Sequence, residues 1–219
     1  MKVSLLGSIL SPQHVVGDLE WPGDLLEFVE VEKKDEAPLW SPAVLGGTDR
    51  KRAPIQTITA LVLDFDGKET GPHCYYHDLQ GACLAFSEYE FVLHTTFSHT
   101  PAAPSFRMIF PLATDMQEWN TVAEVTYRIL WQRLAADTGA DPTSAEARRF
   151  YYGPSCRPGA PRLALHWPGD RRLSSADLPT IASNPPPVLR STSSPSSFPA
   201  PSHVVTPAAG QQGTGFFPE

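Results

Sequence analysis

The sequence predicts a single α/β or α+β domain with a mixed sheet and few helices, followed by a tail. Three observations predict this. Short runs of β-branched and aromatic residues outnumber helical patterns, and only one long stretch is strongly amphipathic. Hydrophobic residues make up 41% of the 219 residues, which is enough for a core. From residue 184 onward, Pro, Ser, Thr, Ala and Gly dominate, so this segment buries too little surface to offset its ordering entropy. We therefore place the folded domain at residues 1–183 and a disordered tail or linker at 184–219.

Composition narrows the class of protein. The formal net charge of −7 argues against a protein that coats nucleic acid, although arginines spread over the second half would still permit a local phosphate site. The 3 cysteines form no Cys-x-x-Cys pair, which argues against a cysteine-based zinc site and against a disulfide framework. The apolar start is too short for a signal segment or a membrane span. We expect a cytoplasmic protein that does not bind membranes.

The first third of the chain predicts few regular elements. Residues 2–6 are apolar and predict a strand. Residues 24–31 predict a helix, because Asp24 stands at an N-cap position after Pro22-Gly23 and several apolar residues follow. Residues 33–54 predict a long loop that contains Trp40, interpreted as a core residue beneath it.

The middle of the chain predicts a hairpin between two helices. Residues 78–86 predict the first helix. Residues 90–97 and 106–112 are rich in β-branched and aromatic residues and predict two strands joined by a longer loop. The longest helix is predicted to begin at Thr114, which forms a capping box with Gln117.

The C-terminal part of the domain predicts a helix end and two strands. Apolar residues from 119 to 134 recur every three or four positions, as expected of one buried helix face. Gly139 is a natural stop for this helix. Residues 148–152 and 162–166 then predict strands, and residues 177–179 close the domain.

Two acids at the end of a hydrophobic strand form the candidate catalytic motif. Residues 58–63 predict a buried strand, and Asp64 and Asp66 follow it with one residue between them. Side chains two apart share a face of a strand, so the two carboxylates lie close and repel each other unless a cation lies between them. Oxygen ligands favour Mg²⁺ or Mn²⁺ over zinc. Removing one carboxylate should then relieve repulsion and raise the stability of the metal-free protein. The alternative interpretation is that each acid caps the following turn at a solvated strand end.

Several stretches occur in an order that resembles a known enzyme family. Taken together they are similar to the catalytic core of the archaeo-eukaryotic primase superfamily, above all to the primase-polymerases of phages, plasmids and integrated elements. The run from residue 94 to 112 is the most specific part. The matching stretches are residues 40–42, 61–66, 94–101, 106–112, 141–142 and 149–152.

The resemblance implies a function and a set of site residues. It implies a DNA primase or polymerase, a nucleotidyltransferase that adds nucleoside triphosphates on a single-stranded DNA template during replication of a phage or mobile element. Asp64, Asp66 and Asp141 would bind two Mg²⁺ or Mn²⁺ ions. His99 would contact the phosphates of the nucleotide. The resemblance also implies that Arg107 and Arg149 contact phosphate or nucleic acid.

The sequence departs from the family pattern at two points. The family has a small residue two positions before its histidine, whereas Phe97 stands there in this chain. The chain also has no Gly-x-x-x-x-Gly-Lys stretch, so a helicase, where one is needed, is expected on a separate chain.

Other interpretations stay open. An inactive primase-like module that binds DNA or a replication partner is one. A haloacid-dehalogenase-type phosphatase with Asp64 as nucleophile is another, although Lys68 follows Gly67 where that family has Thr. Taken singly, His99 could cap a loop, Asp141 could start a turn before a proline, and Arg149 could form a surface ion pair.

Overall fold

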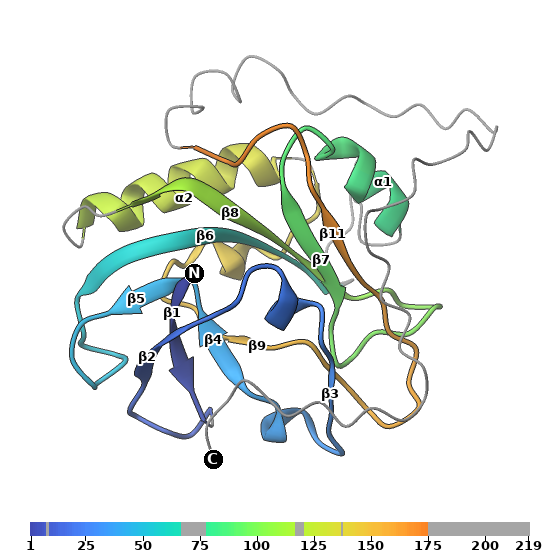
Figure 1. Cartoon of the computed structure of the whole chain (residues 1–219), viewed down its shortest axis with the longest axis horizontal. Coiled ribbons are helices and arrows are strands. Elements are labelled where there is room, and N and C mark those ends of the chain that lie inside the picture. Colours follow the sequence, from blue (N-terminus) through green and yellow to red (C-terminus); the bar gives the residue numbers. More distant parts are fainter. Residues whose placement is uncertain (8, 67–77, 117–120, 137, 175–219) are drawn as a thin grey trace.

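The computed structural model describes residues 1–7, 9–66, 78–116, 121–136 and 138–174. Two helices, a five-stranded sheet and a four-stranded sheet are stacked in that order (Figure 1). Because helices and mainly antiparallel sheets occur in separate layers, the fold class is α+β, as predicted. The expected domain limit at residue 183 and the tail lie outside the described residues.

The five-stranded sheet is the central layer. Each strand is antiparallel to its neighbours. Its longest strands are β6 and β8, which pair along most of their length and shift register between Ile58 and Ala60. In spatial order the sheet consists of β11 (Ala164–Trp167), β7 (Phe91–Thr95), β8 (Phe106–Met116), β6 (Ile55–Phe65) and β5 (Ala43–Leu45).

The second layer is a smaller antiparallel sheet that covers one face of the first. In spatial order it consists of β2 (Val15–Asp18), β1 (Lys2–Leu6), β4 (Leu39–Ser41) and β9 (Tyr151–Tyr152). A separate pair of short parallel strands joins β3 (Val29–Glu30) to β10 (Ser155–Cys156). Parallel and antiparallel pairing therefore both occur in the described chain.

The alternation of side chains along β6 gives the molecule two cores. Leu61, Leu63 and Phe65 face α1 (Leu79–Ala85) and α2 (Thr121–Ala135). The intervening Ala60 and Val62 face the smaller sheet, where they pack with Trp40 and Tyr151. Asp64 continues this second set, so its carboxylate lies at the end of the core between the two sheets.

Several predicted elements are confirmed. The strand at residues 2–6 is β1, and α1 begins after Asp78, whose carboxylate accepts a hydrogen bond from the Gly81 amide at 2.8 Å. The predicted hairpin is formed by β7 and β8. Gly139 follows α2 with a φ of 78°, a left-handed conformation that favours glycine after a helix.

Three predictions near the N-terminus and before α2 are wrong. In place of a helix at residues 24–31 the chain has a short 3₁₀ helix, η1 (Gly23–Leu25), and then β3. The supposed loop at 33–54 contains the 3₁₀ helix η2 (Lys34–Glu36) as well as β4 and β5. Thr114 caps no helix, because β8 continues through it and pairs at Met116 with β6.

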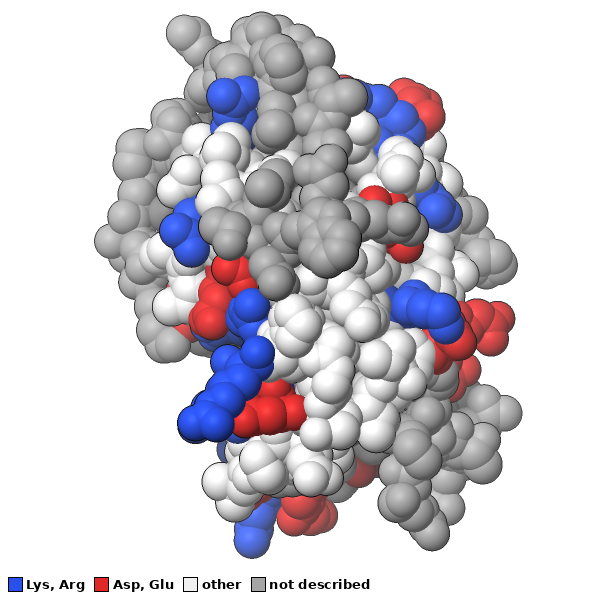
Figure 2. All heavy atoms as spheres, turned by 90° about the vertical axis from the view of Figure 1, so that its left-hand side faces the viewer, with Lys and Arg blue, Asp and Glu red and all other residues white. Residues whose placement is uncertain are grey.

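Surface charge is mixed where the described chain can be viewed. Figure 2 shows one face on which lysines and arginines lie beside acids rather than forming an area of one sign. Among the helices of the described segments, none has both the length and the apolar character needed to cross a membrane.

Candidate active site

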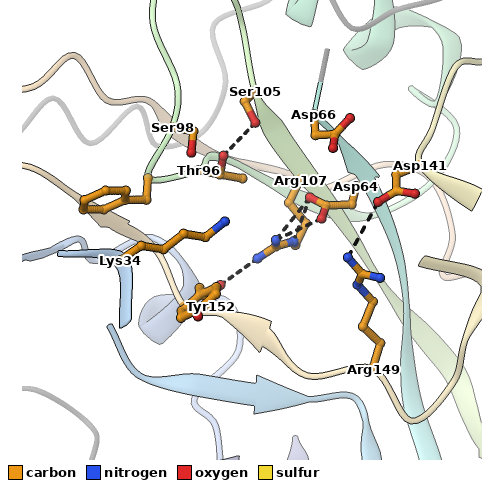
Figure 3. A pocket seen from close by; sticks show the side chains of 12 residues that line it. Lys34, Asp64, Asp66, Thr96, Ser98, Ser105, Arg107, Asp141, Arg149 and Tyr152 are labelled. Carbon is orange, nitrogen blue, oxygen red and sulfur yellow. Dashed lines mark hydrogen bonds and ion pairs between the residues drawn. The ribbon is translucent and has the colours of Figure 1, made fainter. Parts of the chain in front are cut away.

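A polar pocket lies at the ends of β6 and β7, next to β9 of the smaller sheet. It encloses about 230 Å³ and receives side chains from four separate parts of the chain (Figure 3). Its lining consists of Lys34, Asp64, Asp66, Thr96, Phe97, Ser98, Ser105, Arg107, Asp141, Arg149, Tyr152 and Gly153. Five of the six residues that the sequence selected therefore line one pocket, and His99 is not among them.

Asp64 is held by Arg107 in a buried ion pair. The two residues lie directly opposite each other on β6 and β8. Arg107 donates from Nε to Oδ1 and from Nη2 to Oδ2 of Asp64, each over 3.2 Å, and from Nη1 to the Tyr152 carbonyl over 2.6 Å. Its guanidinium also lies 4.7 Å from the centre of the Tyr151 ring. All three guanidinium nitrogens of Arg107 thus donate hydrogen bonds within the protein.

Asp141 reaches the same pocket because the segment after α2 binds to β6 beyond the part that pairs with β5. The Asp141 amide donates to the Asp64 carbonyl over 2.7 Å. Asp141 also caps η3 (Pro142–Ala145), where its carboxylate accepts a hydrogen bond from the Thr143 amide at 2.9 Å. The turn-initiating interpretation of Asp141 and its place in the pocket are therefore both realised. The other carboxylate oxygen lies 3.6 Å from Nη2 of Arg149.

A buried network behind Asp141 fixes the position of η3. Ser144 donates its hydroxyl to the Asp141 carbonyl over 2.6 Å. Trp131 on α2 donates its indole N–H to both the Ser144 hydroxyl, at 3.0 Å, and the Val62 carbonyl on β6, at 3.1 Å. Tyr127 donates its hydroxyl to the Ser144 carbonyl over 3.2 Å. Helix α2 therefore supports the pocket by tying η3 to the central strand.

The three acids of the pocket are the type of ligand that binds a hard divalent cation, but their carboxylates do not form a close group. Asp64, Asp66 and Asp141 are oxygen donors on one pocket wall (Figure 3), the ligand type that Mg²⁺ and Mn²⁺ prefer. Within the described segments, no group of three His, Cys, Asp or Glu side chains is close enough to hold a metal. Two of the three carboxylates instead bind the guanidinium groups of Arg107 and Arg149.

His99 lies beside the pocket and supports its wall. Its Nδ1 accepts a hydrogen bond from the Ser105 amide at 3.2 Å, and its own amide donates to the Thr96 carbonyl at 2.9 Å. Burial lowers the pKa of His99, so the imidazole is neutral near pH 7. With Nδ1 accepting, the proton lies on Nε2. The loop-capping interpretation of this histidine is realised.

Sequence reasoning assigned no role in the site to the other polar residues of the pocket. Lys34 lay in a segment that predicted only loop, yet its ammonium group lies 5.1 Å from the centre of the Tyr152 ring. Thr96 and Ser105 join the two strands of the hairpin through their hydroxyls, 2.7 Å apart. A basic residue before a short polar turn is the only signal that Lys34 gave.

The strand arrangement excludes the phosphatase interpretation. Haloacid-dehalogenase-type enzymes place their nucleophile at the end of a strand in a parallel, doubly wound sheet. Here β6 is antiparallel to both of its partners, β5 and β8.

Comparisons with known proteins return little. No family model matches the chain, and no curated protein matches it. Among solved structures, the chain is similar to the AEP domain of the cyanophage S-2L primase-polymerase, with 9% sequence identity and a TM-score of 0.48. That similarity covers 82% of this chain and 88% of the phage domain.

Proposed function

We propose that the protein is a nucleotidyltransferase of the DNA primase or polymerase kind, which adds nucleoside triphosphates on a single-stranded DNA template. The observation that carries the proposal is the pocket itself. Asp64, Asp66 and Asp141 come from two distant parts of the chain and line one cavity with Lys34 and Arg149. Acids that can hold divalent ions, next to cations that can hold phosphates, are what phosphoryl transfer requires. The order of motifs in the sequence supports the same reaction and a role in replicating a phage or mobile element.

The three carboxylates are the proposed holders of Mg²⁺ or Mn²⁺. When bound, such ions supply charge neutralisation at the attacking and leaving oxygens. Asp66 lines the pocket and is only partly buried, whereas Asp64 is buried beside Arg107. The role of Arg107 in this proposal is to keep the Asp64 carboxylate oriented and compensated, not to contact the nucleotide.

The cations at the rim are the proposed phosphate contacts. Arg149 is partly exposed and its guanidinium already faces a carboxylate, so its fork can turn between Asp141 and a phosphate. The Lys34 side chain extends into the pocket above Tyr152 (Figure 3). His99 keeps the proposed role in nucleotide binding, with its Nε2–H as the donor.

Two observations favour a second candidate, a catalytically inactive module that binds DNA or a replication partner. The buried Asp64–Arg107 pair satisfies both charges internally. In the described segments the carboxylates also form no compact group of three. A protein that has lost its metal ions would retain such a pair for stability alone.

An incorporation assay separates the two candidates. Purified full-length protein is given single-stranded DNA with and without a primer, labelled nucleotides, and Mg²⁺ or Mn²⁺. The active candidate predicts template-dependent products from wild type and almost none from Asp66→Asn or Asp141→Asn. Asp115→Asn is the matched control, because Asp115 is exposed on β8 and does not line the pocket. Absence of products from wild type with either metal favours the inactive module, whereas equal products from Asp66→Asn refute the metal assignment.

A further inference from the structure

Phe97 is an aromatic side chain in an otherwise polar part of the pocket. It lies in the turn that follows β7, between Thr96 and Ser98, and its ring is half-buried. An apolar ring that faces a polar cavity loses the benefit of burial unless a ligand covers it.

The turn that carries Phe97 is rigidly attached to the neighbouring strand. The Thr96 amide donates to the Ser105 carbonyl at 2.9 Å, and the hydroxyls of the same two residues are 2.7 Å apart. The Ser105 amide in turn donates to Nδ1 of His99 at 3.2 Å. The backbone on both sides of Phe97 is therefore held in place, which lowers the entropy lost when a ligand binds there.

A cation lies over the Phe97 ring. The guanidinium carbon of Arg157, an exposed residue just after β10, is 5.2 Å from the ring centre. A guanidinium over an aromatic face is an attractive arrangement and fixes the orientation of the ring. Flat rings of this kind, combined with nearby cations, are the surfaces on which proteins stack bases.

Tyr152 is another aromatic side chain that lines the pocket, but the cation over its ring, Lys34, is itself a lining residue, whereas Arg157 is not. The Tyr152 carbonyl also anchors Arg107. In Figure 3 the carboxylates lie on one side of the pocket, and the turn with Thr96 and Ser98 lies on the other. A nucleotide whose phosphates bind near the acids and Lys34 would thus carry its base toward Phe97.

We propose that Phe97 is the stacking platform for the base of the nucleoside triphosphate, with Arg157 holding the ring in place. This inference rests on the proposed function and adds the base-binding part of the same site. Every base has a flat π surface, so the platform supports all four nucleotides and does not select among them.

Calorimetric titration of the full chain in Mg²⁺ tests the platform with two probes, a nucleoside triphosphate and inorganic tripolyphosphate. Phe97→Leu should weaken nucleoside triphosphate binding by about tenfold, the scale of base stacking on an aromatic ring, and leave tripolyphosphate binding unchanged. Phe97→Tyr should retain the wild-type affinity for both. Phe28→Leu is the matched control, because Phe28 is also half-buried beneath an arginine, Arg162, at 6.0 Å, but lies outside the pocket.

The outcomes distinguish the platform from the function on which it rests. If wild type binds neither probe, the proposed function is wrong. If wild type binds both but Phe97→Leu weakens neither, or weakens both equally, the function stands and the platform is refuted. If Phe97→Leu loses binding to a single-stranded oligonucleotide but not to the nucleoside triphosphate, Phe97 contacts the template, and the proposal is also refuted. If Phe97→Leu fails to fold, a second pair of variants tests the platform. Arg157→Gln should then weaken nucleotide binding, whereas its control, Arg162→Gln, should not.

Discussion

Replacing Arg107 by Met should destabilise the protein strongly, because the change leaves a buried carboxylate without its counter-charge. The side chains of Arg107 and Asp64 are only 7% and 11% exposed, and Nη2 of Arg107 lies 3.1 Å from Oδ1 of Asp64. Removing one partner of such a buried pair costs about 3–5 kcal/mol. We expect the free energy of unfolding to fall by that amount in Arg107→Met. A similar loss is expected in Asp64→Leu, which leaves the buried guanidinium without a counter-charge.

The double variant separates the pair from its surroundings. Two apolar side chains of similar volume leave no buried charge, so Asp64→Leu with Arg107→Met should lose much less than the sum of the single losses. We expect the double variant to lose no more than either single variant does, so the coupling energy should be at least about 3 kcal/mol. This expectation reverses the one drawn from the sequence, where removing an acid was expected to raise stability by relieving repulsion.

Urea unfolding followed by tryptophan fluorescence measures these differences. Free energies come from linear extrapolation, with the slope checked for each variant. Lys2→Met is the matched control, because Lys2 and Asp18 form an ion pair of the same length, 3.1 Å, with side chains that are 62% and 74% exposed. Such an exposed pair contributes only about 0–1 kcal/mol. A loss for Arg107→Met no greater than that for Lys2→Met, or strict additivity in the double variant, would refute the reasoning.

Three further predictions concern His94, His99 and the C-terminal boundary of the folded domain. Burial, with Arg107 nearby, lowers the pKa of His94 to about 3 from 6.5, so the unfolded chain gains a proton in that window that the folded protein does not. Wild type should therefore lose stability as the pH falls from 6.5 toward 3, and His94→Leu should lose less; equal losses would contradict this. His99→Ala should raise the apparent KM for nucleotide and lower kcat, with metal affinity nearly unchanged without nucleotide. Calorimetry that shows lost metal binding and normal nucleotide binding would make His99 a ligand. Limited proteolysis should trim the chain after about residue 184 and leave a stable domain; first cleavage within β6 or β8 would contradict the predicted boundary.

The sequence predicted elements whose stability is local and missed those that depend on distant pairing. Strand β1, helix α1 and the β7–β8 hairpin each follow from hydrophobic pattern and nearby turn residues. Strand β3 instead pairs with β10, more than a hundred residues later, and this pairing overrides the helical appearance of residues 24–31. Thr114 and Gln117 resemble a cap locally, yet pairing of Met116 with Ile58 after a register shift keeps the chain extended.

The acids and, through the family resemblance, the arginines of the pocket were selected from the sequence, but their pairing was not. Asp64 and Asp66 followed from the period of a strand, and both strands that carry Asp64 and Arg107 were predicted. Their register was not, and one residue of shift would have placed the arginine on the opposite face. Lys34 was not selected from the sequence because η2, with three residues, is too short to show a hydrophobic period.

Binding of Mn²⁺ to the full chain, followed by electron paramagnetic resonance in the presence of a nucleoside triphosphate, tests most directly whether the acids of this pocket work as one metal centre. Wild type should bind the ion, and Asp66→Asn and Asp141→Asn should each weaken binding by at least about tenfold, a factor that even outer-shell changes produce at metal sites. The exposed control Asp115→Asn should bind as wild type does. Equal binding by wild type and both pocket variants would contradict the account.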